Sequence, residues 1–199
     1  MSKAFGGERE KERRELILSA AAACVAEEGI EGATLKKVAA RAKVSTGMIA
    51  YYFKDKNHLM IETFRNRAGG FRKRLAEQAG YEPDLQRLRK VFELSFQQGD
   101  TTVWPFWLQF SAQASREPEL MPQHLERIAT VRDDLRRCVA QALATNNIGA
   151  PFEPNLVGDL FLVLYYGLGA LAAAGGDVMP RERVEKLLEL AIESHLTGS

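Results

Sequence analysis

The chain has 199 residues, of which 46% are hydrophobic and 27% charged, a composition typical of a soluble globular protein and not of a disordered one. Its two cysteines, Cys24 and Cys138, lie in apolar helical patterns without metal-ligand spacing, which indicates buried thiols in a reducing cytoplasm. The charged residues 1–15 contain no apolar stretch, so a signal peptide is not expected and the protein is predicted to be cytoplasmic.

Charge is divided unevenly along the chain, although the formal net charge is only +1. Residues 1–74 hold 16 Lys and Arg against 9 Asp and Glu, a net charge of +7, and residues 75–199 hold 11 against 17, a net charge of −6. A basic N-terminal third is typical of a module that binds a polyanion. A solvated basic face is the alternative, since that is the usual role of a charge run.

The N-terminal part of the chain is predicted to form four helices. Residues 1–9 are expected to be disordered, and the first helix is expected to stop at Gly29, a typical C-terminal residue. Two short helices and one long helix follow. The four helices cover about 10–28, two segments within 34–53, and about 56–79.

Five further helices are predicted beyond residue 83, because apolar residues continue to recur at helical spacing with short breaks. Nine helices and no alternating strand pattern make the predicted fold class all-α. The five helices cover about 84–98, 102–116, 119–145, 154–174 and 180–197.

The stretch from Thr34 to Leu59 has the pattern of a helix-turn-helix motif. Apolar or small residues recur at i, i+3, i+4 and i+7 on its first helix, and Ser45 is a good N-cap for the second. Ile49 and Phe53 then fall on the inward face of the second helix. Its outward face carries small and hydroxyl-bearing residues, which a DNA major groove accepts, so the motif predicts DNA binding. The outward residues are Thr46, Gly47, Ala50 and Tyr51.

This stretch resembles the DNA-binding domain of the TetR family of transcriptional regulators. A generic helix-turn-helix would not also carry the Phe-x-x-Lys-x-x-Leu continuation into a fourth helix. The resemblance implies a DNA-binding domain over residues 1–55, a connecting helix over 56–80, and a ligand-binding and dimerisation domain over 81–199. The matching residues are Thr34, Val44, Ser45, Gly47, Ile49, Tyr52, Phe53, Lys56 and Leu59.

The segment 44–57 is similar to the BetI-type branch of this family, whose repressors respond to choline. Ala50 stands where most relatives have a tyrosine, and a small residue there is similar to that branch. The resemblance implies a homodimer that binds a palindromic operator in double-stranded DNA and is released by a small-molecule effector. A cationic, choline-like compound is one candidate effector, and no cofactor is expected.

The resemblance also implies roles for individual residues in DNA binding. Thr34 and Lys36 are expected to reach a phosphate or a flanking base, and Ser45 to touch a phosphate besides capping the recognition helix. The four outward residues would face base edges, and Tyr52 would donate to a phosphate. Lys56 would add charge at a helix N-terminus that already favours an anion. A packing role is the alternative for Tyr52, and a solvated charge for Lys36.

Aromatic residues of the C-terminal part form a candidate effector site. Trp104, Trp107 and Phe110 lie at helical spacing, and Tyr165 and Tyr166 lie in a very apolar helix. Together they are predicted to form an aromatic cage for a quaternary ammonium group. A plain hydrophobic core is the alternative, since aromatics at helical spacing usually pack together.

The helix predicted over 154–174 is unusually apolar. Its residues 160–174 are uncharged, but these 15 residues are fewer than the ~20 that cross a bilayer, so no membrane association is expected. Its small residues allow close approach of another helix. The family resemblance implies a dimer interface formed by this helix and the one over 180–197.

An enzyme and a helical interaction module without DNA binding are the alternatives. Gly167-x-Gly169-x-x-Ala172 mimics a dinucleotide-binding turn, but that turn needs a preceding strand and further βαβ units. The basic N-terminal third argues against the interaction module. No metal site is expected, because the three histidines lack partners at ligand spacing and are predicted to be surface residues. These are His58, His124 and His195.

Overall fold

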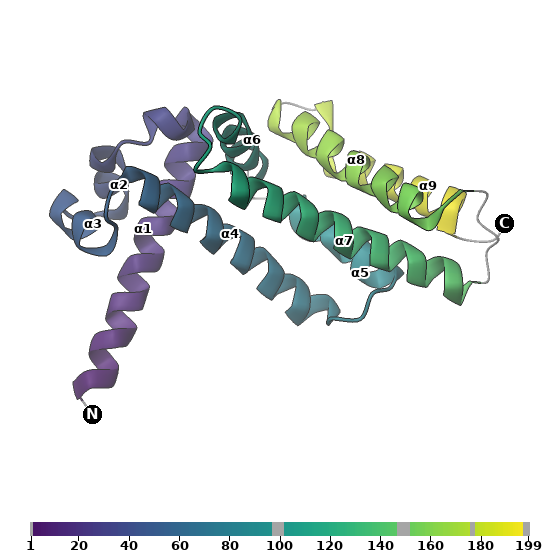
Figure 1. Ribbon diagram of the computed structural model, residues 1–199, viewed down its shortest axis with the longest axis horizontal. Helices are drawn as coiled ribbons and strands as arrows, with labels where there is room; N and C mark the ends of the chain where they lie inside the picture. The colour runs from purple at the N-terminus through teal and green to yellow at the C-terminus, as the bar shows by residue number, and fades with distance from the viewer. Residues whose placement is uncertain (1, 97–101, 147–151, 176–177, 197–199) are drawn as a thin grey trace. The chain divides into compact units, whose positions relative to one another are not determined.

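The computed structural model describes residues 2–96, 102–146, 152–175 and 178–196. Within these ranges the chain forms nine α-helices and no strand, which confirms the predicted all-α fold (Figure 1). The helices are α1 (Ser2–Gly32), α2 (Leu35–Ala42), α3 (Thr46–Tyr52), α4 (Lys56–Ala79), α5 (Leu85–Ser95), α6 (Val103–Ala114), α7 (Met121–Thr145), α8 (Pro154–Ala173) and α9 (Arg181–Leu196).

The start of the chain differs from the sequence-based expectation. Residues 2–9, predicted to be disordered, are the first turns of α1. Residues 8–15 are all Glu, Lys or Arg, which have high helix propensity without giving an apolar periodicity, whereas Gly6 and Gly7 have low propensity, so propensity accounts for residues 8 and 9 only. Gly29, predicted to end the helix, has a left-handed φ of 76° and kinks α1 before its last turn. The other helix ends lie within a few residues of the predicted ones, and the predicted helical residues 97, 98 and 197 lie outside the described ranges.

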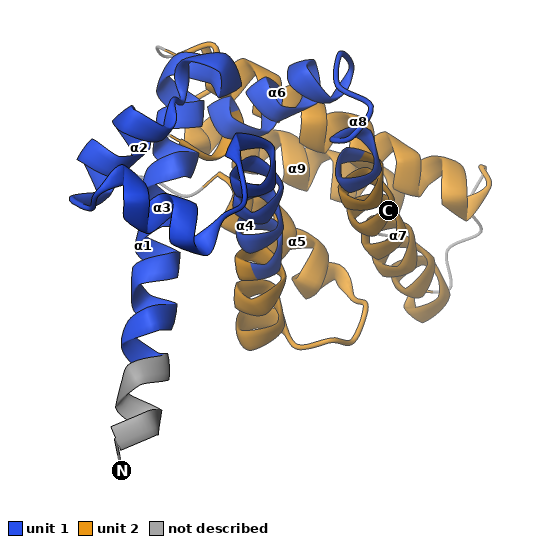
Figure 2. Ribbon diagram, turned by 60° about the vertical axis from the view of Figure 1, so that its left-hand side comes forward, with its two compact units in different colours: residues 1–69, 105–124 blue, residues 70–104, 125–199 orange. Residues whose placement is uncertain are grey.

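The chain divides into two compact units, coloured separately in Figure 2. Unit 1 consists of residues 1–69 and 105–124, and unit 2 of residues 70–104 and 125–199. Helix α4 contributes to both units, and most of α6 belongs to unit 1 with the predicted DNA-binding helices. The predicted functional boundaries at 55 and 80 therefore lie at helix ends and do not coincide with the boundaries of the compact units.

Unit 1 has its own hydrophobic core, which holds α2 and α3 against α1. Ile17 and Val25 of α1 are fully buried, as is Val38 of α2. An ion pair at the surface supports this packing, with Arg41 donating from both terminal nitrogens to the Glu27 carboxylate at 2.5 and 2.6 Å. The helices of the motif thus share one hydrophobic core.

Unit 2 packs α5, α7, α8 and α9 around a second core that contains a buried ion pair. Arg87 of α5 donates from Nε to both carboxylate oxygens of Asp134 in α7 at 3.1 Å, and its Nη1 donates to the Gly80 carbonyl. Cys24 and Cys138 are both buried free thiols. Burial raises the pKa of the Cys138 thiol to about 12, and the negative charge of Asp134 adds to this rise.

Helix α8 is long and apolar enough to cross a membrane by length and composition, and no other helix among the described residues is. One face of this helix packs into unit 2, where Phe161 and Tyr165 are buried, but only 33% of its apolar 18-residue window is buried. Asp159, inside the same helix, forms a two-pronged ion pair with Arg136 of α7, with nitrogen–oxygen distances of 2.7 and 2.6 Å. A polar pair of this kind belongs in a protein interface with water nearby and would be costly in lipid.

Candidate nucleic-acid interface

The ends of α2 and α3 are held by side-chain caps. The Thr34 Oγ1 accepts a hydrogen bond from the Lys37 backbone N–H at 3.3 Å, and the Ser45 Oγ accepts one from the Met48 N–H at 3.1 Å. Between the helices Lys43 adopts a left-handed φ of 54°, which reverses the chain in a tight turn. The predicted N-cap role of Ser45 is confirmed, and Thr34 has the same role for α2.

The face of α3 that was predicted to read DNA is exposed. Thr46, Gly47, Ala50 and Tyr51 all lie at the surface, and 75% of Tyr51 is exposed. Ile49, on the opposite face, is buried in the core of unit 1. The structure therefore brings the four predicted base-facing residues together on one solvent-facing side of a short, capped helix.

The residues predicted to contact phosphates lie around this face. They differ in their exposure and in whether they already have a partner within the protein. Thr34, Lys36 and Ser45 are exposed, and Tyr52 is half-buried with its ring edge-on to the Tyr51 ring, at a centroid distance of 5.1 Å. Lys56 already has a partner in unit 1, because its Nζ donates to the Glu31 carbonyl at 3.0 Å. Lys56 thus ties the start of α4 to the end of α1, a role that the sequence did not reveal.

The five residues of the predicted aromatic cage fall into two groups. In unit 2, Trp104 lies against Tyr165 and Tyr166, with ring centroids 5.0 and 6.1 Å apart. In unit 1, Trp107 and Phe110 lie around Phe64 of α4. Their ring centroids are 5.1 and 4.0 Å from that of Phe64.

A buried arginine lies against the unit 2 group. The Arg127 guanidinium carbon is 5.4 Å from the Tyr166 ring centroid, and Nη1 donates to the Tyr166 hydroxyl at 2.7 Å. The Tyr165 hydroxyl accepts from Arg127 Nη2 at 3.4 Å and shares a hydrogen bond with Ser95 at 2.9 Å. Burial raises the pKa of Tyr166 although the nearby Arg127 acts to lower it, so the hydroxyl stays protonated at neutral pH. The rings thus already attract one positive charge, and sequence reasoning missed it because Arg127 lies in a different helix.

Gly167 and Gly169 of α8 do not form a dinucleotide-binding turn, and Gly169 has a packing role. The preceding residues 160–166 are helical and not a strand. A Cβ atom at Gly169 would lie 2.2 Å from Cε3 of Trp104, so only glycine lets the indole ring rest on the α8 backbone. Gly167, in contrast, faces open space.

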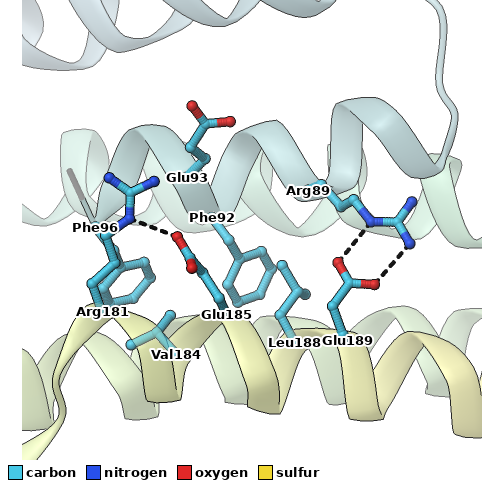
Figure 3. Close-up of a pocket in the computed structure, with 9 residues that line it drawn as sticks. All are labelled: Arg89, Phe92, Glu93, Phe96, Arg181, Val184, Glu185, Leu188 and Glu189. Atoms are coloured by element: carbon cyan, nitrogen blue, oxygen red, sulfur yellow. Dashed lines mark hydrogen bonds and ion pairs between the residues drawn. The ribbon is translucent and has the colours of Figure 1, made fainter.

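A small pocket lies between α5 and α9 in unit 2 (Figure 3). Its walls are apolar, from Phe92 and Phe96 on one side to Val184 and Leu188 on the other, and ion pairs such as Arg89–Glu189 lie at its rim. Its volume of about 150 Å³ is below the ~300 Å³ of the smallest usual ligand pockets. None of the predicted cage residues lines this pocket.

The fold and the exposed face of α3 define a helix-turn-helix DNA-binding protein with an additional helical region. Residues 17–63 match the family model described as "Bacterial regulatory proteins, tetR family", and residues 84–197 match "BetI-type transcriptional repressor, C-terminal". The chain therefore belongs to the TetR family of transcriptional regulators and to its BetI-type branch, as the residues of the motif predicted.

Individual relatives agree with this assignment. The chain is 30% identical to the HTH-type transcriptional regulator BetI of Cronobacter sakazakii, over 94% of this chain and 92% of the relative. It is 28% identical to BetI of Escherichia coli K12, over 92% and 94%. A solved TetR-family regulator from Rhodococcus sp. has 25% identity and a TM-score of 0.78 over 94% of this chain and all of the other. A regulator from Saccharomonospora viridis in complex with choline has the same fold, with 20% identity and a TM-score of 0.78 over 95% of this chain and all of the other.

The protein is thus a TetR-family helix-turn-helix transcriptional regulator of the BetI-like repressor type. Members of this family are regulators and not enzymes.

Proposed function

We propose that this protein acts in the cytoplasm as a homodimeric repressor that binds a palindromic operator through α3 and is released from it by a small-molecule effector. The observation that carries the proposal is the exposed face of Thr46, Gly47, Ala50 and Tyr51, which share one solvent-facing side of a short, capped helix. In a dimer, one α3 would enter each half-site in successive turns of the major groove. The flanking residues Thr34, Lys36, Ser45, Tyr52 and Lys56 would bind or face the phosphates.

A fluorescence-anisotropy titration tests this proposal. The duplex carries the palindrome upstream of the protein's own gene, and a scrambled duplex of equal length serves as the control. We expect a Kd in the nanomolar range, on the order of 10³-fold or more tighter for the palindrome. Rising salt should weaken binding to both duplexes steeply, because phosphate contacts release counterions. Equal affinity for the two duplexes would refute sequence-specific repression.

The proposed dimer interface is an apolar stripe along α8. Leu156, Leu160, Val163 and Leu171 are 59, 43, 68 and 42% exposed, and they follow one another at helical spacing on one face. Gly167 falls in the same stripe and faces open space, which would let a second helix approach closely. A continuous exposed apolar surface of this kind marks a protein–protein contact.

Val163→Asp is expected to convert the dimer to a monomer, because it places a carboxylate in the centre of this stripe. The operator affinity should fall by about 100-fold or more, since each half-site would then bind independently. Sedimentation velocity measures the first effect and anisotropy the second. Val178→Asp is the matched control, because Val178 is also exposed, at 53%, but lies outside α8. A Val163→Asp protein that sediments as a dimer would exclude α8 as the interface.

The proposed effector site consists of Trp104, Tyr165 and Tyr166 in unit 2. It does not include Trp107 and Phe110, which pack around Phe64 in unit 1. The clustering of these three rings supports a site for a cation, since aromatic faces attract positive charge, and at present the Arg127 guanidinium lies beside the Tyr166 ring. A quaternary ammonium group would take the place of this guanidinium and change the contact between α7 and α8. The regulator from Saccharomonospora viridis that binds choline makes choline the first probe.

Choline at 100 times its Kd is expected to stabilise the protein by about 2.7 kcal/mol, a rise in Tm of roughly 5–10 °C. Tyr166→Leu should abolish this rise because it removes the ring, and Tyr166→Phe should retain most of it because the ring remains. Thermal-shift measurements at increasing choline concentration give both results. Stabilisation by carboxylates but not by choline would contradict a cation site and would indicate a ligand that pairs with Arg127.

A further inference from the structure

Helix α1 extends toward the N-terminus beyond the part that packs under α2 and α3 (Figure 1). Ile17 belongs to the buried stripe of α1, and the residues four and eight positions before it are Arg13 and Arg9. Residues at i and i+4 share one helix face, so the face that packs on the helix-turn-helix motif continues into two arginines. Both arginines are exposed.

These arginines line an open depression beside the recognition helix. Its volume is about 570 Å³, and α3 and its cap form the other wall. Two guanidinium groups and one carboxylate, that of Glu10, give the depression a net positive charge. The residues that line it are Arg9, Glu10, Arg13, Ser45, Met48, Tyr51 and Tyr52.

Neighbouring basic residues of α1 have other environments. Arg14 pairs with Glu62 of α4 and lies over the Phe53 ring, with its guanidinium carbon 5.4 Å from the ring centroid, so it already has partners within unit 1. Lys11 is exposed and does not line the depression. Only part of the basic surface of α1 therefore faces the side on which α3 would enter DNA.

We propose that Arg9 and Arg13 form an additional phosphate-binding site, which grips the DNA backbone next to the half-site read by α3. This inference rests on the proposed DNA binding and extends it to a segment whose side chains no motif singled out. The depression is continuous with Ser45 and Tyr52, which are already expected to bind phosphates. A guanidinium matches a phosphate by paired hydrogen bonds. An open, solvated surface suits the sugar-phosphate backbone of DNA, which would pass along it, whereas a small anion would need an enclosed site.

The test compares wild type, Arg9→Ala/Arg13→Ala and Lys11→Ala in operator titrations at several salt concentrations. The double variant is expected to bind roughly 10- to 100-fold more weakly at low salt, and its slope of log K against log salt should be about 2 smaller in magnitude, since each lost phosphate contact removes about 0.9. The ratio of operator to scrambled-duplex affinity should stay unchanged, because phosphates carry no sequence information. Lys11→Ala should bind like wild type. All three proteins should unfold at the same temperature, because these side chains are exposed.

Two outcomes separate this inference from the function on which it rests. Equal salt slopes for wild type and the double variant, with operator specificity intact in both, would overturn the phosphate site alone. A wild type that does not discriminate the operator would overturn the proposed function. Operator duplexes shortened to the half-site edges give a second readout. Wild type should lose affinity on shortening while the double variant changes little, and equal losses in both proteins would also overturn the site.

Discussion

Tyr51→Ala is expected to weaken operator binding by about 10- to 100-fold, the loss of one good base contact of ~1–3 kcal/mol. The residue is 75% exposed and its ring lies edge-on to that of Tyr52, so its removal should not lower the Tm. Anisotropy with the palindromic duplex measures the loss, and a thermal melt measures stability. An unchanged operator affinity would show that α3 does not read DNA through this position.

Tyr81→Ala is the matched control for this variant. Tyr81 is also an exposed tyrosine, at 83%, but it lies between α4 and α5 in unit 2. Its removal deletes the same atoms from the surface without touching the recognition helix. A loss of operator affinity in Tyr81→Ala equal to that in Tyr51→Ala would mean that the effect is general and not a base contact.

Asp134→Ala is expected to destabilise the protein by about 3–5 kcal/mol, because it leaves the Arg87 guanidinium buried without its carboxylate. Both side chains are only 11% exposed, and Arg87 Nε lies 3.1 Å from each oxygen of Asp134. For a chain of this size the Tm should fall by roughly 6–20 °C. Differential scanning calorimetry or a urea titration measures the change, provided that unfolding is two-state.

Asp133→Ala provides the comparison within the same helix. The Asp133 side chain is 55% exposed and pairs with its neighbour Arg132 at the surface, so its loss should cost at most about 1 kcal/mol. Replacing both buried partners, as in Arg87→Met/Asp134→Leu, should restore much of the stability, because no uncompensated charge then remains. Equal destabilisation by Asp133→Ala and Asp134→Ala would show that the buried pair has no special role.

The helix-turn-helix could be predicted in detail from the sequence because its determinants are local. The caps at Thr34 and Ser45 act on N–H groups three residues away, and the inward position of Ile49 follows from helical spacing. The same residues that form the motif also carry the family resemblance. Both ends of the first helix differed from the prediction, since α1 begins at Ser2 and continues past Gly29 to Gly32.

The effector region could be predicted only as a set of aromatic residues. Spacing along the chain placed Trp104 and Trp107 near each other, but one packs with Tyr165 in unit 2 and the other with Phe64 in unit 1. The reason for Gly169 is equally invisible in the sequence, because it depends on where the Trp104 ring rests. Helical periodicity predicts which side chains are buried, but it does not predict which aromatic ring each of them packs against.

The sequence by itself determined the all-α architecture, the exposed face of α3 and the family, because periodicity and capping operate within a few residues of each other. Only the tertiary structure shows which side chains that are far apart in the chain form polar contacts. Arg127 reaches Tyr166 across 39 positions, and Arg87 reaches Asp134 across 47. It also placed Arg9 and Arg13 beside Ser45. Partners so far apart in the chain are brought together by the packing of whole helices. That packing depends on many side chains at once, so the sequence around one residue does not predict its partner.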